Sequence, residues 1–343
     1  MSKRGLIFVA ITLACVMLAG GWVLAASRDA GSETSKARVE VEADVPPTVS
    51  APPGSGRNAP VRVAGRVLVR AVDARDSRLN GQVAEATLGD GIGSATEVGS
   101  LACQRVHMAA EAGLCLALAP SGVEYRARIF DGRFKTRAEF PLTGLPSRSR
   151  VSPSGRWGAI TTFVSGDAYA EAGEFSTRTT IIDMRAGRPI ADLEKFEARK
   201  GADRIDAPDF NFWGVTFARD DDTFYATLAT GGERYLVKGS LNERRVELLR
   251  KNVECPSLSP DGTRVAYKKR VGEVEDWRLH VLELDSGRDV ALSERRSIDD
   301  QVEWLGDGTI IYGDERSVWA VRADGGGRPR RILRSAASPT ALR

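Results

Sequence analysis

Two short turn signatures recur along this chain, and their spacing restricts its fold more than any other feature. The first is a strand-like run, a tight turn built from Ser, Pro, Asp and Gly, and a second strand-like run. Pro presets one backbone angle, Asp caps its own backbone and Gly accepts a positive φ, so such a turn reverses the chain direction. Copies occur at 152–155 (SPSG), 259–262 (SPDG) and 305–308 (LGDG), with a degenerate copy at 218–222 (ARDDD).

The second signature is a strand that ends at Asp, followed by Gly and in most copies by Arg. It recurs about every 40 to 50 residues, which is the length of one four-stranded blade of a β-propeller. A two-sheet β-sandwich is the alternative, but turns that stay in phase over so many repeats argue against it. The Asp residues are Asp131, Asp183, Asp285 and Asp324, with weaker copies at Asp90 and at 239–242.

The repeats divide the chain after residue 62 into six units, so we expect an all-β, six-bladed β-propeller over 63–343. The first unit has only three strands. Its missing inner strand can come from the C-terminal tail, 336–342, which would pair the first and last strands and leave no open edge in the ring. The expected blades are 64–98, 101–142, 148–193, 212–250, 254–292 and 300–334.

The N-terminal segment is typical of an exported protein. Lys3 and Arg4 precede an uncharged apolar run, 5–26. This run has a length at which a cleaved signal peptide and an uncleaved membrane-spanning helix overlap. Val23 and Ala25 are small, as signal peptidase requires, whereas Trp22 would suit an anchor retained at the membrane interface. We therefore expect 1–26 to be a hydrophobic helix that acts as a signal peptide or membrane anchor, and the protein to be extracytoplasmic.

Residues 27–62 are rich in Pro, Ser, Gly and charge and contain no aromatic residue. Such a segment buries too little apolar surface to offset the entropy of ordering it, so we expect a flexible, disordered linker. The whole chain has a formal charge of +3, and the part after residue 26 has +1. A nearly balanced charge argues against a nucleic-acid partner.

The cysteines also fit export. Cys103 and Cys115 flank a short turn between two strand-like runs, where neighbouring strands bring side chains close together. In an oxidising compartment we expect a Cys103–Cys115 disulfide, with Cys255 left over. Two buried free thiols are the alternative.

The repeat sequences SPSGRW and SPDGTRVAY resemble those of TolB-like, WD-type β-propellers over about residues 64–343. More narrowly, the chain resembles TolB-like proteins of actinobacteria that carry a signal peptide and no attached catalytic domain. This resemblance implies a six-bladed fold, an extracytoplasmic location and a protein-binding role. No segment matches the separate N-terminal α/β domain of TolB. The narrower likeness lies in 101–116, 145–163, 212–232, 253–267 and 299–304.

The chain shows no motif for catalysis, a cofactor or a metal. It has no GxSxG elbow of the kind that a hydrolase domain attached to a propeller would need, and no HExxH, EF-hand or phosphate-binding glycine loop. Only two histidines are present, His107 and His280, so a multi-histidine metal site is excluded. The acidic run 220–222 is typical of a solvated turn. We expect no cofactor, no metal and no catalytic residue, and a non-enzymatic role is favoured.

The long, irregular segments are expected on one face of the ring, which we call the long-loop face. They are 73–81, 165–178, 194–211, 270–276 and 293–299. Loops on a rigid scaffold are frequent binding sites, and aromatic residues among acids would suit a peptide or a basic protein. For Trp213, as for Phe212 and Trp304, packing between blades is the alternative. The candidate binding residues are Tyr169, Phe175, Asp206, Asp209, Trp213, Asp299 and Asp300.

The sequence therefore favours an exported, cell-envelope-associated propeller that acts as a scaffold. We expect it to be a monomer and to bind an envelope protein or peptide through the long-loop face, with a membrane contact through 1–26 if this segment is not cleaved. The alternative is a carbohydrate-active hydrolase or lyase that uses loop carboxylates. A third reading is a sensor that binds a small ligand in the central channel.

Overall fold

The computed structural model describes residues 61–72, 80–89, 91–93, 95–164, 176–272 and 276–343. The chain divides into two units, 1–53 and 54–343, and every described residue belongs to the second. The expected export segment 1–26 and all of the linker up to residue 60 lie outside the described residues. Within the described ranges, no helix has the length and apolar character needed to cross a membrane.

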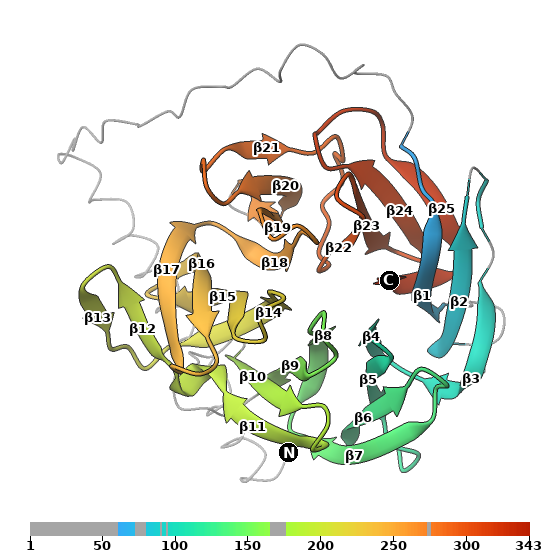
Figure 1. Cartoon of the computed structure of the whole chain (residues 1–343), viewed down its shortest axis with the longest axis horizontal. Coiled ribbons are helices and arrows are strands. Elements are labelled where there is room, and N and C mark those ends of the chain that lie inside the picture. The colour runs from blue at the N-terminus through green and yellow to red at the C-terminus, as the bar shows by residue number, and fades with distance from the viewer. Residues whose placement is uncertain (1–60, 73–79, 90, 94, 165–175, 273–275) are drawn as a thin grey trace, which may run out of the picture. The chain divides into compact units, whose positions relative to one another are not determined.

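Six β-sheets surround a common axis, which confirms the six-bladed β-propeller (Figure 1). We number the blades 1 to 6 in chain order, and in each blade the inner strand lies next to the axis. Blade 1 contains β26 (Ala336–Leu342), β1 (Gly65–Ala71), β2 (Gln82–Leu88) and β3 (Thr96–Ala102). Blade 2 contains β4 (Arg105–Ala109), β5 (Ala112–Leu118), β6 (Tyr125–Asp131) and β7 (Thr136–Leu142). Blade 3 contains β8 (Leu145–Val151), β9 (Trp157–Val164), β10 (Ser176–Asp183) and β11 (Arg188–Asp192).

The second half of the ring repeats this order from the axis outward. Blade 4 contains β14 (Asn211–Phe217), β15 (Thr223–Thr230), β16 (Glu233–Ser240) and β17 (Arg245–Lys251), with two further strands at its outer edge. Blade 5 contains β18 (Glu254–Leu258), β19 (Arg264–Arg270), β20 (Trp277–Glu283) and β21 (Asp289–Ala291). Blade 6 contains β22 (Glu303–Leu305), β23 (Thr309–Asp314), β24 (Ser317–Arg322) and β25 (Arg330–Arg334).

The C-terminal strand closes the ring as expected. β26 pairs antiparallel with β1, in a register that places Arg66 opposite Leu342 and Val67 opposite Ala341. Blade 1 is therefore built from the two ends of the propeller segment, and Figure 1 shows the C-terminus beside β1. This arrangement gives β1 a partner on both sides.

The segment 194–211, expected to be an irregular loop, contains regular structure, which corrects the sequence-based expectation. A 3-10 helix, η1 (Leu193–Lys195), leads into β12 (Glu197–Lys200) and β13 (Asp203–Ile205). β12 runs parallel to β17 and extends blade 4 to six strands. The physical reason is a period-2 pattern in which Phe196 and Ala198 are buried between charged neighbours.

The repeated turns have the chemistry that their sequences predict. Ser152 Oγ accepts a hydrogen bond from the Trp157 backbone N–H at 3.0 Å, and Ser259 Oγ accepts the equivalent bond from Arg264 at 3.0 Å. Gly155 and Gly262 adopt positive φ values of 73° and 75°. The degenerate turn in blade 4 has no glycine, and Asp221 takes the left-handed conformation there with a φ of 58°.

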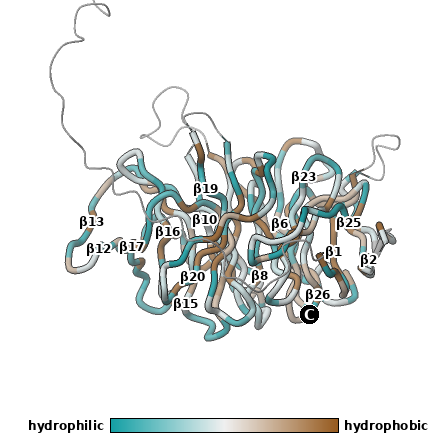
Figure 2. The backbone as a smooth tube through the Cα atoms, turned by 90° about the horizontal axis from the view of Figure 1, so that it is seen from above, coloured by the Kyte–Doolittle hydropathy of each residue, from teal (hydrophilic) through white to brown (hydrophobic). Residues whose placement is uncertain are grey.

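The hydrophobic core lies between neighbouring blades. Each of six buried clusters joins residues of two adjacent blades, so every blade interface of the described structure has its own core. Figure 2 shows the apolar segments in the interior of the ring and hydrophilic turns towards its faces. Phe212 packs between blades 3 and 4, and Trp304 packs between blades 5 and 6. Packing is thus the role of these two aromatic residues.

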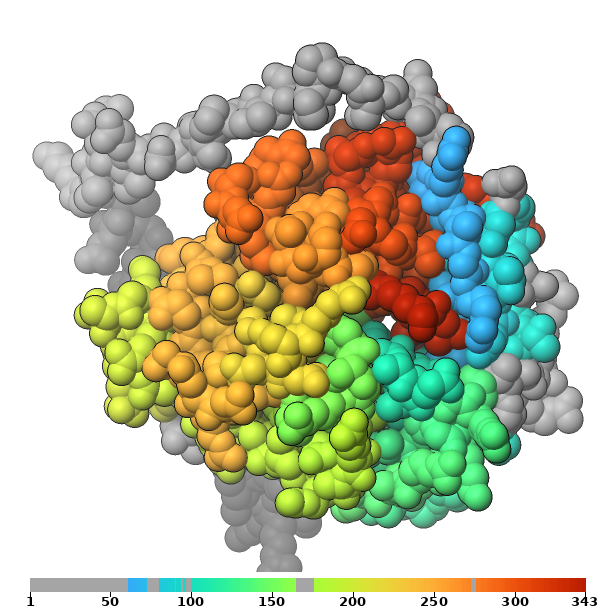
Figure 3. Space-filling model, viewed as in Figure 1, coloured from blue at the N-terminus to red at the C-terminus, as the bar shows by residue number. Residues whose placement is uncertain are grey.

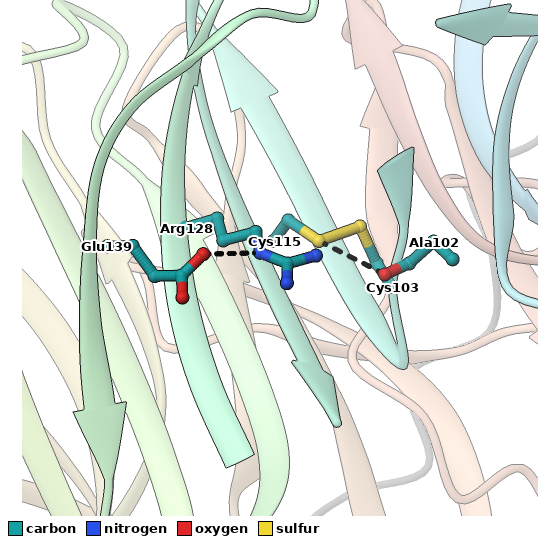
Figure 4. Close-up of a disulfide and its surroundings, with 5 residues drawn as sticks. All are labelled: Ala102, Cys103, Cys115, Arg128 and Glu139. Carbon is teal, nitrogen blue, oxygen red and sulfur yellow. Dashed lines mark hydrogen bonds and ion pairs between the residues drawn. A yellow bond between two sulfur atoms is a disulfide. The ribbon is translucent and has the colours of Figure 1, made fainter. Parts of the chain in front are cut away.

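The structure contains the expected disulfide between Cys103 and Cys115, whose Cα atoms are 5.4 Å apart. Cys103 follows β3 and Cys115 lies in β5, so the disulfide joins the crossing from blade 1 to the second strand of blade 2 (Figure 4). Arg128, opposite Cys115 on β6, forms an ion pair with Glu139 at 2.7 Å. Cys255 is a buried free thiol.

Candidate functional site

A cavity of about 350 Å³ opens around the axis at the end of the ring where the inner strands begin. This end is the long-loop face, because the connections between blades enter the inner strands there. We call the cavity the channel mouth, and Figure 3 shows the blades packed closely around the narrow centre of the ring. Blades 2 to 5 and the connection from blade 5 to blade 6 contribute to its lining, which consists of Arg105, Ser147, Arg148, Phe163, Thr177, Trp213, Arg234, Glu254, Lys268, Arg270, Trp277 and Asp299.

One side of the channel mouth is organised by Glu254, at the start of β18. This buried carboxylate accepts a hydrogen bond from Trp277 Nε1 at 3.0 Å. The Arg234 Nε atom lies 3.4 Å from Glu254 Oε1, and Arg270 Nε lies 3.8 Å from the same oxygen. A single carboxylate therefore compensates two guanidinium groups.

The other side is organised by Asp299, just before β22. Asp299 forms ion pairs with Arg148, at 3.2 Å, and with Lys268. The Lys268 side chain is only 3% exposed and its Nζ lies 4.4 Å from the centre of the Trp277 ring, in a cation–π contact. The channel wall around Asp299 would raise the pKa of its carboxyl group, but the charges of Lys268 and Arg148 outweigh this effect and lower it. Asp299 thus remains a carboxylate.

Arg105, at the start of β4, is the fifth base of the channel mouth. Its Nε donates a hydrogen bond to the Ser147 carbonyl oxygen at 2.6 Å, and its guanidinium forms no ion pair with a carboxylate of the described residues. Burial lowers the pKa of Arg105, and the nearby charge of Arg148 lowers it further, whereas Asp300 acts in the opposite direction. Two guanidinium groups therefore lie close together, with the carboxylates of Asp300 and Asp299 nearby.

Below the channel mouth, a charged cluster crosses the channel. Arg150 of β8 forms an ion pair with Glu303 of β22 and donates a second hydrogen bond to the Val302 carbonyl oxygen at 3.1 Å. Burial alone would raise the pKa of Glu303, but Arg150, His107 and Arg343 together outweigh burial and lower it to about 2. His107 Nδ1 accepts the backbone N–H of Val151 at 3.1 Å, and burial, followed by the charge of Arg150, lowers the pKa of His107. The histidine is therefore neutral at pH 7.

Beside this cluster, the side chain of Gln301 forms a second contact between blades. Gln301 Nε2 donates hydrogen bonds to the Val215 carbonyl at 3.0 Å and to the Pro256 carbonyl at 2.9 Å. β-Bulges in β14 and β18, where Gly214 and Cys255 adopt positive φ values of 64° and 50°, precede these carbonyl groups. Glycine accepts such a φ without strain, whereas Cys255 adopts it at a steric cost.

The channel mouth and two further cavities lie in succession along the axis and share lining residues. A space of only about 30 Å³ shares Arg105 and Arg148 with the channel mouth and is also lined by Arg150. A further cavity of about 230 Å³ on the opposite side is lined by Arg150, Glu303 and Arg343. The Arg150–Glu303 pair therefore lies between the channel mouth and the cavity at the opposite end of the channel.

The structure brings three of the expected site residues to the axis. Asp299 and Trp213 line the channel mouth, and Asp300 lines the small space below it. Trp213 is 8% exposed, so the side chain packs closely and still contributes to the wall. Tyr169 and Phe175 lie outside the described residues.

Two other expected residues lie away from the axis. Asp209 accepts hydrogen bonds from Thr230 Oγ1 and from the Gly231 backbone N–H, both at 2.6 Å, and so holds the turn between β15 and β16. It lines a separate cavity of about 330 Å³ at the connection from blade 3 to blade 4. Asp206 is exposed and lines neither cavity.

The sequence analysis missed the basic residues of the channel mouth, because it searched the loops for candidates. A signal was present in β8, where the sequence SRSRV places Arg148 and Arg150 two residues apart in an inner strand. Charged residues are unusual at such positions unless they face a polar channel. Among the described residues, no group of three or more His, Cys, Asp or Glu side chains is placed to hold a metal ion.

Comparison with known proteins supports the fold. No family model matches the chain, and no curated protein sequence matches it. The structure of TolB from Acinetobacter baumannii matches with a TM-score of 0.58 and 14% identity, over 81% of this chain and 67% of that one. The structure of a nidogen/laminin complex matches with a TM-score of 0.52 and 11% identity, over 80% of this chain and 98% of that one. The chain therefore has the six-bladed β-propeller fold of the TolB-like proteins.

Proposed function

We propose that this protein is an exported, envelope-associated propeller that binds a protein or peptide partner at the channel mouth. The observation that carries this proposal is the channel mouth itself, a concave space of about 350 Å³ lined by charged and aromatic residues from four blades and the connection before blade 6. A concave space of this volume lies in the range of ligand sites, and its largely charged lining suits a charged ligand. The strands of the blades hold most of these side chains on a rigid frame, which reduces the entropy lost on binding.

The state of the carboxylates favours binding over glycoside hydrolysis. A glycosidase pair needs one carboxyl group that is protonated and one that is ionised. The two carboxylates of the channel mouth, Glu254 and Asp299, are each engaged by two bases, and the pKa of Asp299 is lowered. Asp209 is occupied by hydrogen bonds to a neighbouring turn. These groups are therefore better suited to hold a charged ligand than to donate a proton.

Two further observations support an extracytoplasmic location and a protein partner. The Cys103–Cys115 disulfide is of a kind that persists in oxidising compartments, in agreement with the export pattern of 1–26. One of the matching structures is that of a nidogen/laminin complex, which is an assembly of two proteins. A monomeric state and membrane attachment through an uncleaved 1–26 belong to the same proposal.

The test is affinity capture from detergent-solubilised envelopes of the source cells, with full-length protein as the bait. A variant of the channel mouth, Trp213→Ala combined with Arg234→Gln, is compared with Arg322→Gln, which alters an arginine paired with Asp324 at a turn between two outer strands. We expect the wild type and Arg322→Gln to recover the same protein and the channel-mouth variant to lose it. Recovery that does not depend on the channel mouth would refute the site, and no recovery by any bait would refute the function.

A further inference from the structure

We propose that the segment that enters the channel mouth is an acidic peptide, and that Arg105 together with Arg148 binds its carboxylate. This inference rests on the proposed function, since it names the chemistry of the segment that the channel mouth admits. It also reverses the expectation from the loop sequences, in which aromatic residues among acids suggested a basic partner.

The first step is the charge of the lining. The channel mouth contains five basic side chains and two carboxylates, so its formal charge is positive. Glu254 is shared by Arg234 and Arg270, and Asp299 is shared by Arg148 and Lys268. None of these four bases therefore has a carboxylate to itself. A concave surface with an excess of one sign of charge attracts ligands of the opposite sign.

The second step concerns the N–H groups of Arg105 and Arg148 that remain available to bind a ligand. A guanidinium group has five N–H donors, and Arg105 uses its Nε and Nη1 on main-chain carbonyl groups. Arg148 is 12% exposed and spends its Nη1 and Nη2 on Ser147 and Asp299, while its buried Nε has no hydrogen-bond partner among the described residues. Arg105 and Arg148 both line the channel mouth and the small space below it. They therefore mark the deep end of the pocket as the place for an anionic group.

The third step is the energetic state of these arginines without a ligand. Arg105 is partly removed from water and lies beside a second guanidinium, and both effects lower its pKa, whereas Asp300 and Asp299 raise it. Burial would also lower the pKa of Arg148, but Cys255, Asp300 and Asp299 outweigh burial and raise it. A carboxylate at this point would reduce the repulsion between the two guanidinium groups and form charge-assisted hydrogen bonds, which are stronger than neutral ones. The pocket therefore has two guanidinium groups in place at its base before a ligand binds.

The fourth step distinguishes a peptide from a sugar acid or a free anion. A sugar would need an open aromatic face for stacking, but Trp213 and Trp277 are 8% and 7% exposed, and Lys268 covers a face of Trp277. The channel mouth also has an apolar part, at Phe163, which is 38% exposed. A free phosphate would contact only the basic groups and not this apolar part. A peptide with an acidic residue beside an apolar one satisfies both parts of the pocket.

The test begins with selection of displayed random dodecapeptides on the immobilised full-length protein. Each enriched peptide is then synthesised in two forms, one as selected and one with every Asp and Glu replaced by Asn and Gln. We expect enrichment of acidic residues, an affinity at least about tenfold lower for the amide form, and weaker binding as the salt concentration rises.

Variants of the protein assign the contact to Arg105. Arg105→Gln is expected to weaken binding of the acidic form by about tenfold or more and to leave the amide form nearly unchanged, because only the former has the carboxylate. Arg322→Gln is the matched control and is expected to bind like the wild type. Arg105→Glu is expected to reject the acidic form and to accept peptides in which Lys replaces the acid. This exchange of preference shows that the variant is folded.

The outcomes separate this inference from the proposed function. Peptides that bind the channel mouth equally well in acidic and amide forms would overturn the acidic-peptide inference and leave the function standing. If no peptide is enriched, the proposed function fails as well. A third arm titrates inorganic phosphate: Arg105-dependent phosphate binding without peptide enrichment would show that the pocket holds a free anion, which also overturns the inference.

Discussion

Arg150 of blade 3 and Glu303 of blade 6 form a buried ion pair across the axis of the propeller. The two residues are 153 positions apart in the sequence and lie in strands on opposite sides of the ring. This contact joins the two halves of the ring at its centre, below the pocket that we propose as the binding site. The pair is therefore expected to contribute to the stability of the ring.

We expect Glu303→Gln to destabilise the protein by about 3 to 5 kcal/mol, because it leaves the buried charge of Arg150 without its partner. Urea unfolding at pH 7 measures this change. The double variant Arg150→Met, Glu303→Leu removes both charges and is expected to cost less than Glu303→Gln. An equal or larger loss in the double variant would contradict this view of the pair.

The pH dependence of stability provides a separate test of Glu303. Its pKa in the folded state is about 2, below the ordinary value of 4.5, so the unfolded state binds the proton more tightly. The stabilisation, on the order of 3 kcal/mol, is complete above about pH 4.5 and is lost as the pH falls towards 2. We expect the difference in unfolding free energy between the wild type and Glu303→Gln to shrink between pH 5 and pH 2. A difference that stays constant over this range would show that Glu303 does not titrate in this way.

The pKa of Glu194, in η1, is shifted in the opposite direction to that of Glu303. Its Oε1 accepts the Thr179 backbone N–H at 2.8 Å, whereas its buried Oε2 has no hydrogen-bond partner among the described residues. Burial, with a smaller contribution from Asp192, raises the pKa of Glu194 to about 8. The folded state therefore binds this proton more tightly, and stability falls as the pH rises from about 4.5 to 8.

We expect Glu194→Gln to remove this decline, so that the variant gains stability relative to the wild type at pH 8.5 but not at pH 4.5. Thermal unfolding at both pH values measures the effect. Glu243→Gln is a suitable control, because Glu243 is an exposed residue of the turn that leads to β17. A gain of equal size at both pH values would indicate a change in packing instead of titration.

The ring was predictable from the sequence because its turns are determined locally. Ser152 and Gly155, like Ser259 and Gly262, form hydrogen bonds and backbone angles within a few residues of each other. Such chemistry is visible in a single segment, and the regular spacing of these segments then predicts the number of blades. The role of β26 as the closing strand could be predicted from the number of strands in the first unit, without knowledge of contacts.

The channel mouth was not predictable in the same way, because it depends on register within the inner strands. β8 has a register shift between Pro146 and Arg148, and β26 has one near Ser338, which adopts a φ of 50°. A bulge changes which side chains face the axis, and the sequence of a strand does not show where it occurs. The contact between Arg105 and Ser147 also joins different blades, and the repeats carry no information about it.

The last prediction concerns β26, which supplies the inner strand of blade 1. Removal of 336–343 would leave β1 with an unpaired edge and expose Val67 and Leu68, which are now fully buried. We expect the truncated protein to lose cooperative unfolding and to associate through this edge. Removal of Arg343 alone leaves every pair of the β26 register in place and is the control.

Rescue distinguishes loss of the strand from general damage. A synthetic peptide with the sequence of residues 335–343 contains every residue of β26 and is expected to restore cooperative unfolding when it is added to the truncated protein. A scrambled peptide of the same composition has the wrong alternation of buried and exposed side chains and is expected to have no effect. Calorimetry measures both cases. A truncated protein that unfolds like the wild type without any peptide would show that the pairing of β26 with β1 does not hold the ring closed.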